Sequence, residues 1–476
     1  MRVDSFRRAL ARAALLLSVS LGVGTPPAHA QPPQRPDAAS VPSAPAASAA
    51  TPASAPAAER GAELSVYLVT MGQGDAVWEK FGHNALWVHD PARGTDHVYN
   101  WGIFDFDSPG YWSRFVKGDW LYMMGVETVE QLLWQYQMRN RTVTVQELNL
   151  TPAQKAELQA FVEWNALPQN REYLYDYYRD NCSTRVRDVL DRVLGGRLQA
   201  ATADSVTPTT YRWHSERLIA DDQASYVGLL AGLGPAADRP ITAWEEMFLP
   251  EKVQQQVRRL QVPAARGRLV PLVAREQAVF PAFGRAPERE APPFWLPYFL
   301  AAGLAIGGLF VLLGRWAERA RAGRVVFSAL AALWALLAGT GGVLLLGLWL
   351  LTNHRIAYQN ENLFQLHPLL LVLALLVPAL AFGARWAARP ARFFALLAAG
   401  IATLGLLVQV LPGLDQVNGS FIALTLPIHW GLAVAVARLA GDPLWLRPQA
   451  ALLRPADRRQ RQLCSTRGRC AARAGR

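Results

Sequence analysis

The C-terminal half of the chain contains five long apolar stretches separated by short polar links, and this pattern limits what the chain can fold into. The stretches run over about 295–313, 325–351, 366–383, 393–411 and 421–437. A helix needs about 20 apolar residues to cross the hydrocarbon core of a bilayer. Buried core helices would hardly occur five times in succession with such short links. The sequence therefore predicts a region of five transmembrane helices over residues 291–440.

The arginines in the links predict how these helices are oriented. The first and third links carry clusters that include Arg315 and Arg385, and more arginines follow the fifth stretch, whereas the second and fourth links carry only Arg355. Basic residues concentrate in cytoplasmic loops. We therefore expect a multi-pass protein of the inner membrane, with the residues before the first span facing the periplasm and the Arg-rich tail, 441–476, in the cytoplasm.

The first 30 residues have the pattern of a secretory signal peptide. Arg7 and Arg8 belong to a basic start, residues 13–21 form a short apolar run, and Ala28-His29-Ala30 matches a cleavage site. An uncleaved signal anchor is the alternative. Residues 31–60 are almost wholly Ala, Pro, Ser and Gln, and we expect them to form a disordered linker because they have little to bury.

The formal net charge of +11 would by itself suggest a nucleic-acid partner. Most of the excess lies in the predicted cytoplasmic links and tail and in the removable signal. The charge therefore reflects membrane orientation, and we expect no nucleic-acid partner.

Residues 61–290 remain as an exported globular domain, for which the patterns predict an α+β fold with a catalytic core over about 61–200. Asp90 to Thr95 have the turn chemistry of a hairpin. Thr151 and Pro152 are typical of a helix start. The expected strands are Leu64–Thr70, Ala85–His89, His97–Trp101 and Arg141–Leu150, and the expected helices are Val129–Tyr136, Pro152–Trp164 and about Ser183–Leu194.

This domain contains a single cysteine, Cys182, with no partner for a disulfide in its own compartment. It lies where a loop enters a predicted helix, a position at which exposed amide groups and the helix dipole favour a thiolate. Arg179, Arg185 and Arg187 add positive charge nearby in the sequence. The alternative is an inert buried cysteine.

A nucleophilic thiolate needs a base, and the exported domain has only four histidines, His83, His89, His97 and His214. His89 and His97 flank the predicted hairpin turn, and His214 lies in no motif. His83 enters a strand directly after a glycine, so it is our choice. A polar group usually orients such an imidazole. We expect Asn100 on the paired strand to do so, with Asp105 or Asp107 behind it.

Several sequence islands resemble the Lnb-type lipoprotein intramolecular transacylases and their unnamed relatives. The islands are Phe81-Gly82-His83, Val98 to Phe106, Phe115 to Gly118, Tyr175 to Arg185, Trp244 to Pro250 and, in the membrane half, Asn360-Glu361-Asn362. The family is similar to circularly permuted papain-like and NlpC-like enzymes, in which the histidine precedes the cysteine.

The resemblance implies acyl transfer without a cofactor or metal, on an acyl ester of a lipoprotein or membrane lipid. Cys182 would be the nucleophile and His83 the general base and then acid, through a thioester. Backbone amides at the start of the helix after Cys182 could hold the oxyanion. Tyr178, Asn181 and Arg185, in the island around the cysteine, are supporting candidates.

Two other functions remain open at this stage. The same permuted fold could cleave amides of the cell wall as an amidase or peptidase, or the domain could be a non-catalytic envelope binding module. The 352–367 link could touch a lipid head group or the catalytic cleft, although an ordinary polar loop is the simpler reading. No zinc or serine-hydrolase motif occurs in the sequence.

Overall fold

A computed structural model describes residues 59–105, 107–264 and 267–441. The predicted signal peptide, most of the linker and the Arg-rich tail lie outside the described residues.

The N-terminal domain is built on a seven-stranded antiparallel sheet with the strand order β11-β5-β1-β2-β3-β4-β6. The strands are β1 (Ser65–Met71), β2 (His83–Asp90), β3 (Thr95–Ile103), β4 (Leu121–Thr128), β5 (Val143–Leu148), β6 (Glu172–Leu174) and β11 (Val273–Phe280). Strands β2 and β3 form the predicted hairpin, in which Asp90 pairs with Thr95.

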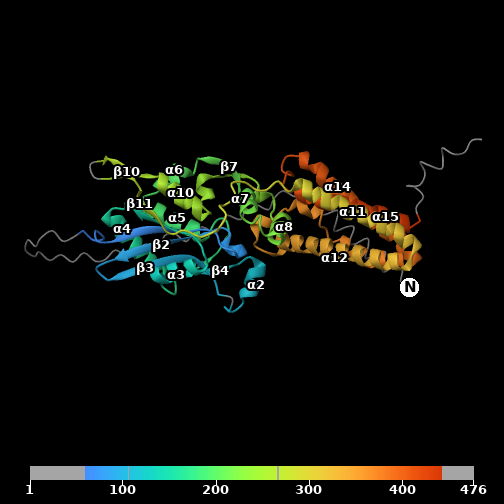
Figure 1. Cartoon of the computed structure of the whole chain (residues 1–476), viewed down its shortest axis with the longest axis horizontal. Coiled ribbons are helices and arrows are strands. Elements are labelled where there is room, and N and C mark those ends of the chain that lie inside the picture. Colours follow the sequence, from blue (N-terminus) through green and yellow to red (C-terminus); the bar gives the residue numbers. More distant parts are fainter. Residues whose placement is uncertain (1–58, 106, 265–266, 442–476) are drawn as a thin grey trace, which may run out of the picture. The chain divides into compact units, whose positions relative to one another are not determined.

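Both faces of the sheet are covered by helices (Figure 1). Successive side chains of a strand point to opposite faces, so Leu68 of β1 joins the core with α4 (Pro152–Asn165), α5 (Cys182–Val193) and α10 (Pro250–Arg259). Val69, its neighbour, packs on the other face with Leu132 of α3 (Val129–Met138). The helix that begins at Cys182 is thereby held rigidly against the centre of the sheet.

The expected α+β class and every predicted element of this domain are confirmed, with shifts of a few residues at the ends. Thr151 caps α4 through the Gln154 amide, and Pro152 opens the helix as expected. The remaining elements of the domain are η1 (Val77–Glu79), α2 (Tyr111–Lys117), α6 (Arg197–Thr202), β7 (Val206–Thr210), α7 (Tyr211–Leu218), α8 (Gln223–Gly232), η2 (Pro235–Ala237), β8 (Pro240–Thr242), α9 (Ala243–Glu246), β9 (Gln261–Pro263) and β10 (Leu269–Pro271).

The C-terminal region consists of five apolar helices, α11 (Leu296–Arg319), α12 (Arg321–Leu351), α13 (Leu370–Ala381), α14 (Arg385–Leu407) and α15 (Gly419–Leu439). Four of them are long and apolar enough to cross a membrane. The exception is α13, which has 12 residues and a length of about 18 Å. The third apolar stretch was expected to start at about residue 366, whereas α13 starts only at Leu370. The short helix η5 (Glu361–Phe364) precedes it in the link.

The long link between α12 and α13 is not an ordinary polar loop, because it docks onto the N-terminal domain. Nδ2 of Asn362 donates to the carbonyl of Leu230 at 2.8 Å, and Nδ2 of Asn360 donates to the carbonyl of Ala231, also at 2.8 Å. These carbonyls belong to the last turn of α8, whose free acceptors need partners from outside the helix. Asn360, Glu361 and Asn362 are buried. The link therefore joins the membrane region to the N-terminal domain through hydrogen bonds from its side chains to backbone carbonyls of α8.

We predict that Asn362→Leu loosens this junction. The substitution keeps the side-chain size but leaves the Leu230 carbonyl without its donor, at a cost of about 1–3 kcal/mol. Hydrogen exchange of the purified protein should speed up in α8 and in residues 352–367, with the central strands unchanged. Asn149→Leu is the matched control, because Asn149 bonds the Pro271 carbonyl at an exposed position. Equal exchange in the two variants would contradict the prediction.

Candidate active site

Cys182 is the first residue of α5, and its position is set by the residue before it. Asn181 caps the helix: its Oδ1 accepts from the amides of Ser183 and Thr184, each at 2.9 Å. The Nδ2 of Asn181 donates to the carbonyls of Tyr177 and Phe248, also at 2.9 Å. Asn181 thus ties the start of α5 to two other segments. Its role is to place the thiol.

His83 reaches Cys182 from the start of the central strand β2. The preceding Gly82 has a φ of +79°, and a side chain there would meet the Met71 carbonyl at 2.8 Å, so the sharp turn into the strand requires glycine. The imidazole of His83 and the thiol of Cys182 interact by a hydrogen bond and by charge. Both side chains are half-buried. The structure therefore brings together the predicted nucleophile and base.

The two groups shift each other's ionisation. Burial alone would raise the pKa of the Cys182 thiol, but the charge and hydrogen bond of His83 outweigh it, and the pKa is lowered with help from the Asn84 amide. Burial alone would likewise lower the pKa of His83, but the neighbouring Cys182 outweighs it and the pKa is raised. A lowered thiol pKa and a raised imidazole pKa widen the pH range in which the thiolate–imidazolium pair exists.

A chain of hydrogen bonds behind His83 sets which of its nitrogens faces the thiol. Nε2 of His83 lies 3.0 Å from Oδ1 of Asn100, and Nδ2 of Asn100 donates to Glu127 at 2.6 Å. Gln135 donates to the other oxygen of Glu127 at 2.7 Å. A carboxylate only accepts, so Asn100 must turn its Nδ2 to Glu127 and its Oδ1 to His83. Nε2 then carries the hydrogen, and Nδ1 is left to take the proton of the thiol.

The oxyanion donors differ from those expected. The amides of Ser183 and Thr184 are already occupied by the Asn181 cap, so they cannot serve as predicted. The first residue of a helix also has a free amide. Within the part of the chain that the structure describes, the backbone amide of Cys182 donates no hydrogen bond. The thiol and one donor for a developing oxyanion therefore come from the same residue.

Cys182 and His83 open into a groove of about 740 Å³ whose walls are mainly aromatic and aliphatic. The aromatic lining comes from α2, β4 and the segment before Cys182, and Ile356 of the docked link contributes as well. Tyr122 and Tyr175 stack at 4.2 Å between ring centroids. Charge is confined to one region, where Glu79 lies 3.3 Å from Arg139 and 3.4 Å from Arg141. The reactive pair thus faces a mostly apolar space.

Of the remaining two supporting candidates, Tyr178 lines the groove and Arg185 does not. Tyr178 lines the groove and its hydroxyl lies 2.8 Å from that of Ser215, which makes it part of the wall. Arg185 pairs with Asp180 and stacks over Tyr173 at 4.2 Å. Burial raises the pKa of the Cys182 thiol, and the positive charge that most lowers it comes from His83, whereas Arg185 and Arg187 pair with Asp180 and Asp188.

Asp105 does not stand behind Asn100, and neither does Asp107. Asp105 is exposed after the end of β3, where its Oδ1 accepts from the Asp107 amide at 2.9 Å. Glu127 takes the place expected for them. No sequence pattern indicates Glu127, because only the pairing of β4 with β3 brings it beside Asn100.

The other three histidines of the domain have structural partners. His89 pairs with Asp96 at 2.8 Å near the hairpin turn, and the His97 ring lies edge-on to Tyr99 at 6.3 Å between ring centroids. His214 is buried and lies 2.9 Å from Glu246. Among the described residues no group of three or more His, Cys, Asp or Glu side chains could hold a metal ion.

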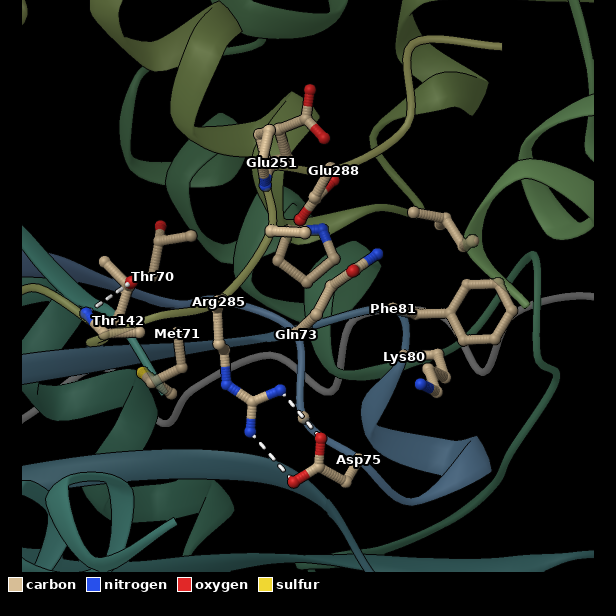
Figure 2. A pocket seen from close by; sticks show the side chains of 18 of the residues that line it. Thr70, Met71, Gln73, Asp75, Lys80, Phe81, Thr142, Glu251, Arg285 and Glu288 are labelled. Atoms are coloured by element: carbon tan, nitrogen blue, oxygen red, sulfur yellow. Dashed lines mark hydrogen bonds and ion pairs between the residues drawn. The ribbon is translucent and has the colours of Figure 1, made fainter. Parts of the chain in front are cut away.

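A second cavity of about 990 Å³ lies on the other side of Phe81, Gly82 and Pro250. Its lining is about equally polar and apolar. Figure 2 shows Arg285 bound to Asp75, and the two hydrogen bonds measure 2.8 and 3.0 Å. The residues that line it, all from the described part of the chain, include no cysteine and no histidine. The groove at Cys182 is therefore the better candidate for chemistry.

Comparison with known protein families gives two matches. Residues 57–217 match the family model described as the Lnb N-terminal periplasmic domain, and residues 289–438 match that of the Lnb transmembrane domain. No curated protein and no solved structure matches the chain significantly. A periplasmic domain joined to a transmembrane domain makes this a multi-pass protein of the inner membrane.

We predict that Cys182 is alkylated rapidly at neutral pH and that His83→Ala slows the reaction. Without the imidazole, the effect of burial is opposed only by the smaller contributions of the Asn84 amide and the Ser183 hydroxyl, so the pKa of the thiol rises. A rise of one unit lowers the thiolate population at neutral pH roughly tenfold. The measurement is the iodoacetamide rate against pH, followed by mass spectrometry of the Cys182 peptide, in a Cys464→Ser, Cys470→Ser background. His89→Ala is the control, and a His83→Ala rate equal to it would count against the pair.

Proposed function

Because the chain belongs to the Lnb family, we propose that it is a membrane-anchored thiol acyltransferase or acyl hydrolase that acts on acyl esters of lipoproteins or membrane lipids. Cys182 would be the nucleophile, and His83 would be the general base and then the general acid. Asn100 would orient the imidazole, and Glu127 would hold Asn100.

One observation carries the proposal: the thiol–imidazole pair opens into a groove walled mainly by aromatic and aliphatic side chains. An acyl chain has no polar groups to satisfy, so such a groove suits it, and burying it there is favourable by about 0.8 kcal/mol per methylene. A cell-wall peptide carries amide groups that would lose their hydrogen bonds to water in these surroundings. The groove therefore favours an acyl ester over the muropeptide of the alternative function.

The proposed reaction has two halves. In the first, the Cys182 sulfur forms a bond to the ester carbonyl carbon, the ester C–O bond breaks, and the leaving alcohol takes the proton from Nδ1 of His83. The product is a thioester on Cys182. In the second, an amine or water attacks that carbonyl and gives its proton to His83. The sulfur leaves, and the acyl group ends as an amide or a free acid.

The backbone supplies part of the electrostatic support. The amide of Cys182 would donate to the carbonyl oxygen while it carries negative charge in both halves. The Asn84 amide donates to the sulfur and so stabilises the thiolate before attack. Both amides belong to rigid elements, α5 and β2, so they need no rearrangement during the reaction.

We predict that Cys182→Ala abolishes acyl transfer and that His83→Ala loses activity to a similar extent, because the two groups act as one unit. Detergent-purified protein would be incubated separately with diacylated lipopeptide, phospholipid and muropeptide, and the products identified by mass spectrometry. His89→Ala is the matched control, since it lies on the same strand and pairs with Asp96 at a partly exposed site.

Each outcome of this experiment decides something. Acyl chains that move or leave only when Cys182 is intact would support the proposal. Muropeptide cleavage with unchanged lipids would overturn it in favour of a wall amidase. A His83→Ala variant with the turnover of His89→Ala would reject His83 as the base.

We also predict that Glu127→Leu lowers turnover roughly tenfold or more, because Asn100 is then free to turn and His83 loses its single tautomer. Asn100 raises the pKa of His83 through its hydrogen bond, so the alkaline limb of the pH–rate profile should move to lower pH. Glu127→Gln keeps an oxygen that can accept from Asn100 and should restore most of the activity. A Glu127→Leu variant with a normal pH profile would contradict this role.

A further inference from the structure

The short helix α2 carries large apolar side chains that are exposed. Trp112 is 65% exposed, Val116 is 64% exposed and Phe115 is 41% exposed. Lys117 is exposed on the same helix, and Arg114 is partly so. Apolar side chains together with basic ones are typical of a helix that lies in the interface of a membrane.

The end of α2 is attached to the end of a membrane span. Helix α12 ends at Leu351, and the amide of Asn353, two residues later, donates to the Lys117 carbonyl at 2.7 Å. The Asn353 side chain donates to Asp119 at 2.7 Å. Gly118 ends α2 with a φ of +79°, and a side chain there would approach the backbone of Asn353 at 3.0 Å. The contact between α2 and the link is therefore close and specific.

The bilayer must reach the end of α12, where Asn353 contacts α2. Leu350 and Leu351 are still strongly exposed at the very end of α12, and Trp349 is exposed beside them. Apolar surface of this kind on a spanning helix needs lipid around it, and Trp is typical of the boundary between hydrocarbon and head groups. Since Asn353 touches Lys117, the exposed face of α2 lies at the level of the periplasmic leaflet.

The same helix also forms a wall of the catalytic groove. Tyr111, Trp112 and Phe115 line the groove that contains Cys182, and Ile356 of the docked link lines it as well. His354 packs edge-on against Trp120 at 5.6 Å between ring centroids. Helix α2 and the link thus stand between Cys182 and the lipid.

From these contacts we propose that α2 dips into the periplasmic leaflet and forms the entrance through which an acyl chain passes from the bilayer to Cys182. The inference rests on the proposed function for its substrate, a lipid acyl ester, but the contact with lipid can be tested without it. A chain that enters beside α2 leaves the bilayer without crossing water, so its methylenes remain in apolar surroundings throughout.

The activity test uses Val116→Asp, because Val116 is exposed but does not line the groove. The full chain would be reconstituted in phosphatidylethanolamine–phosphatidylglycerol vesicles. Turnover would be measured on a diacylated lipopeptide embedded in the vesicles and on p-nitrophenyl butyrate in solution. We expect the ratio of the first rate to the second to fall roughly tenfold, because a carboxylate resists burial in lipid. The matched control is Val206→Asp, at a site that is 69% exposed on β7.

The contact with lipid is tested directly by fluorescence. Val116→Cys and Val206→Cys would each be labelled with the fluorophore NBD in a background of Cys182→Ala, Cys464→Ser and Cys470→Ser. We expect nitroxide-labelled lipids in the vesicles to quench the label at 116 strongly and the label at 206 weakly.

The outcomes separate this inference from the proposed function. Equal quenching at the two sites would overturn the membrane contact, and so would quenching at 116 that disappears as protein concentration rises, since a second copy would then cover α2. An unchanged rate ratio in Val116→Asp would overturn the entrance. If wild-type protein turns over neither ester, the proposed function fails, while the quenching still decides whether α2 meets lipid.

Discussion

The thiol–imidazole pair depends on the packing of one helix against the centre of one sheet. Cys182 begins α5 and His83 begins β2, and they meet because Val186, Val189, Leu190 and Val193 of α5 pack on the same sheet face as Leu86 and Trp101. The pair shifts both pKa values toward the charged forms only while the two groups stay in contact. A small displacement of α5 would leave burial as the main effect on both groups, and burial opposes both charges.

The polar network behind His83 extends this constraint across the sheet. His83, Asn100 and Glu127 lie on three adjacent strands, β2, β3 and β4, so the register of two strand pairs decides whether they meet. The orientation of one amide then selects the tautomer of the imidazole. Strand pairing, through this chain of hydrogen bonds, therefore sets which nitrogen of His83 faces the thiol.

The membrane region is more than an anchor in this structure. Its long link supplies hydrogen bonds to the last turn of α8, contacts α2 through Asn353 and lines the groove through Ile356. These contacts fix the position of the groove relative to the end of α12, and so its height above that end. A lipid-linked substrate would need such a height, because its ester group lies at the boundary between hydrocarbon and water.

Features that arise from local periodicity and chemistry could be predicted from the amino-acid sequence. The length of the apolar stretches and the distribution of arginines predicted the membrane region. The alternation of apolar and polar residues and the capping residues predicted the strands and helices around Cys182. The unpaired cysteine and the small number of histidines pointed to Cys182 and His83 as a candidate pair. Other features follow from the three-dimensional fold alone. They include the position of Glu127 behind Asn100, the loss of the Ser183 and Thr184 amides to the Asn181 cap, and the docking of Asn360 and Asn362. These contacts join residues whose separation along the chain carries no periodic signal, and they depend on strand pairing and packing, which a single sequence does not reveal.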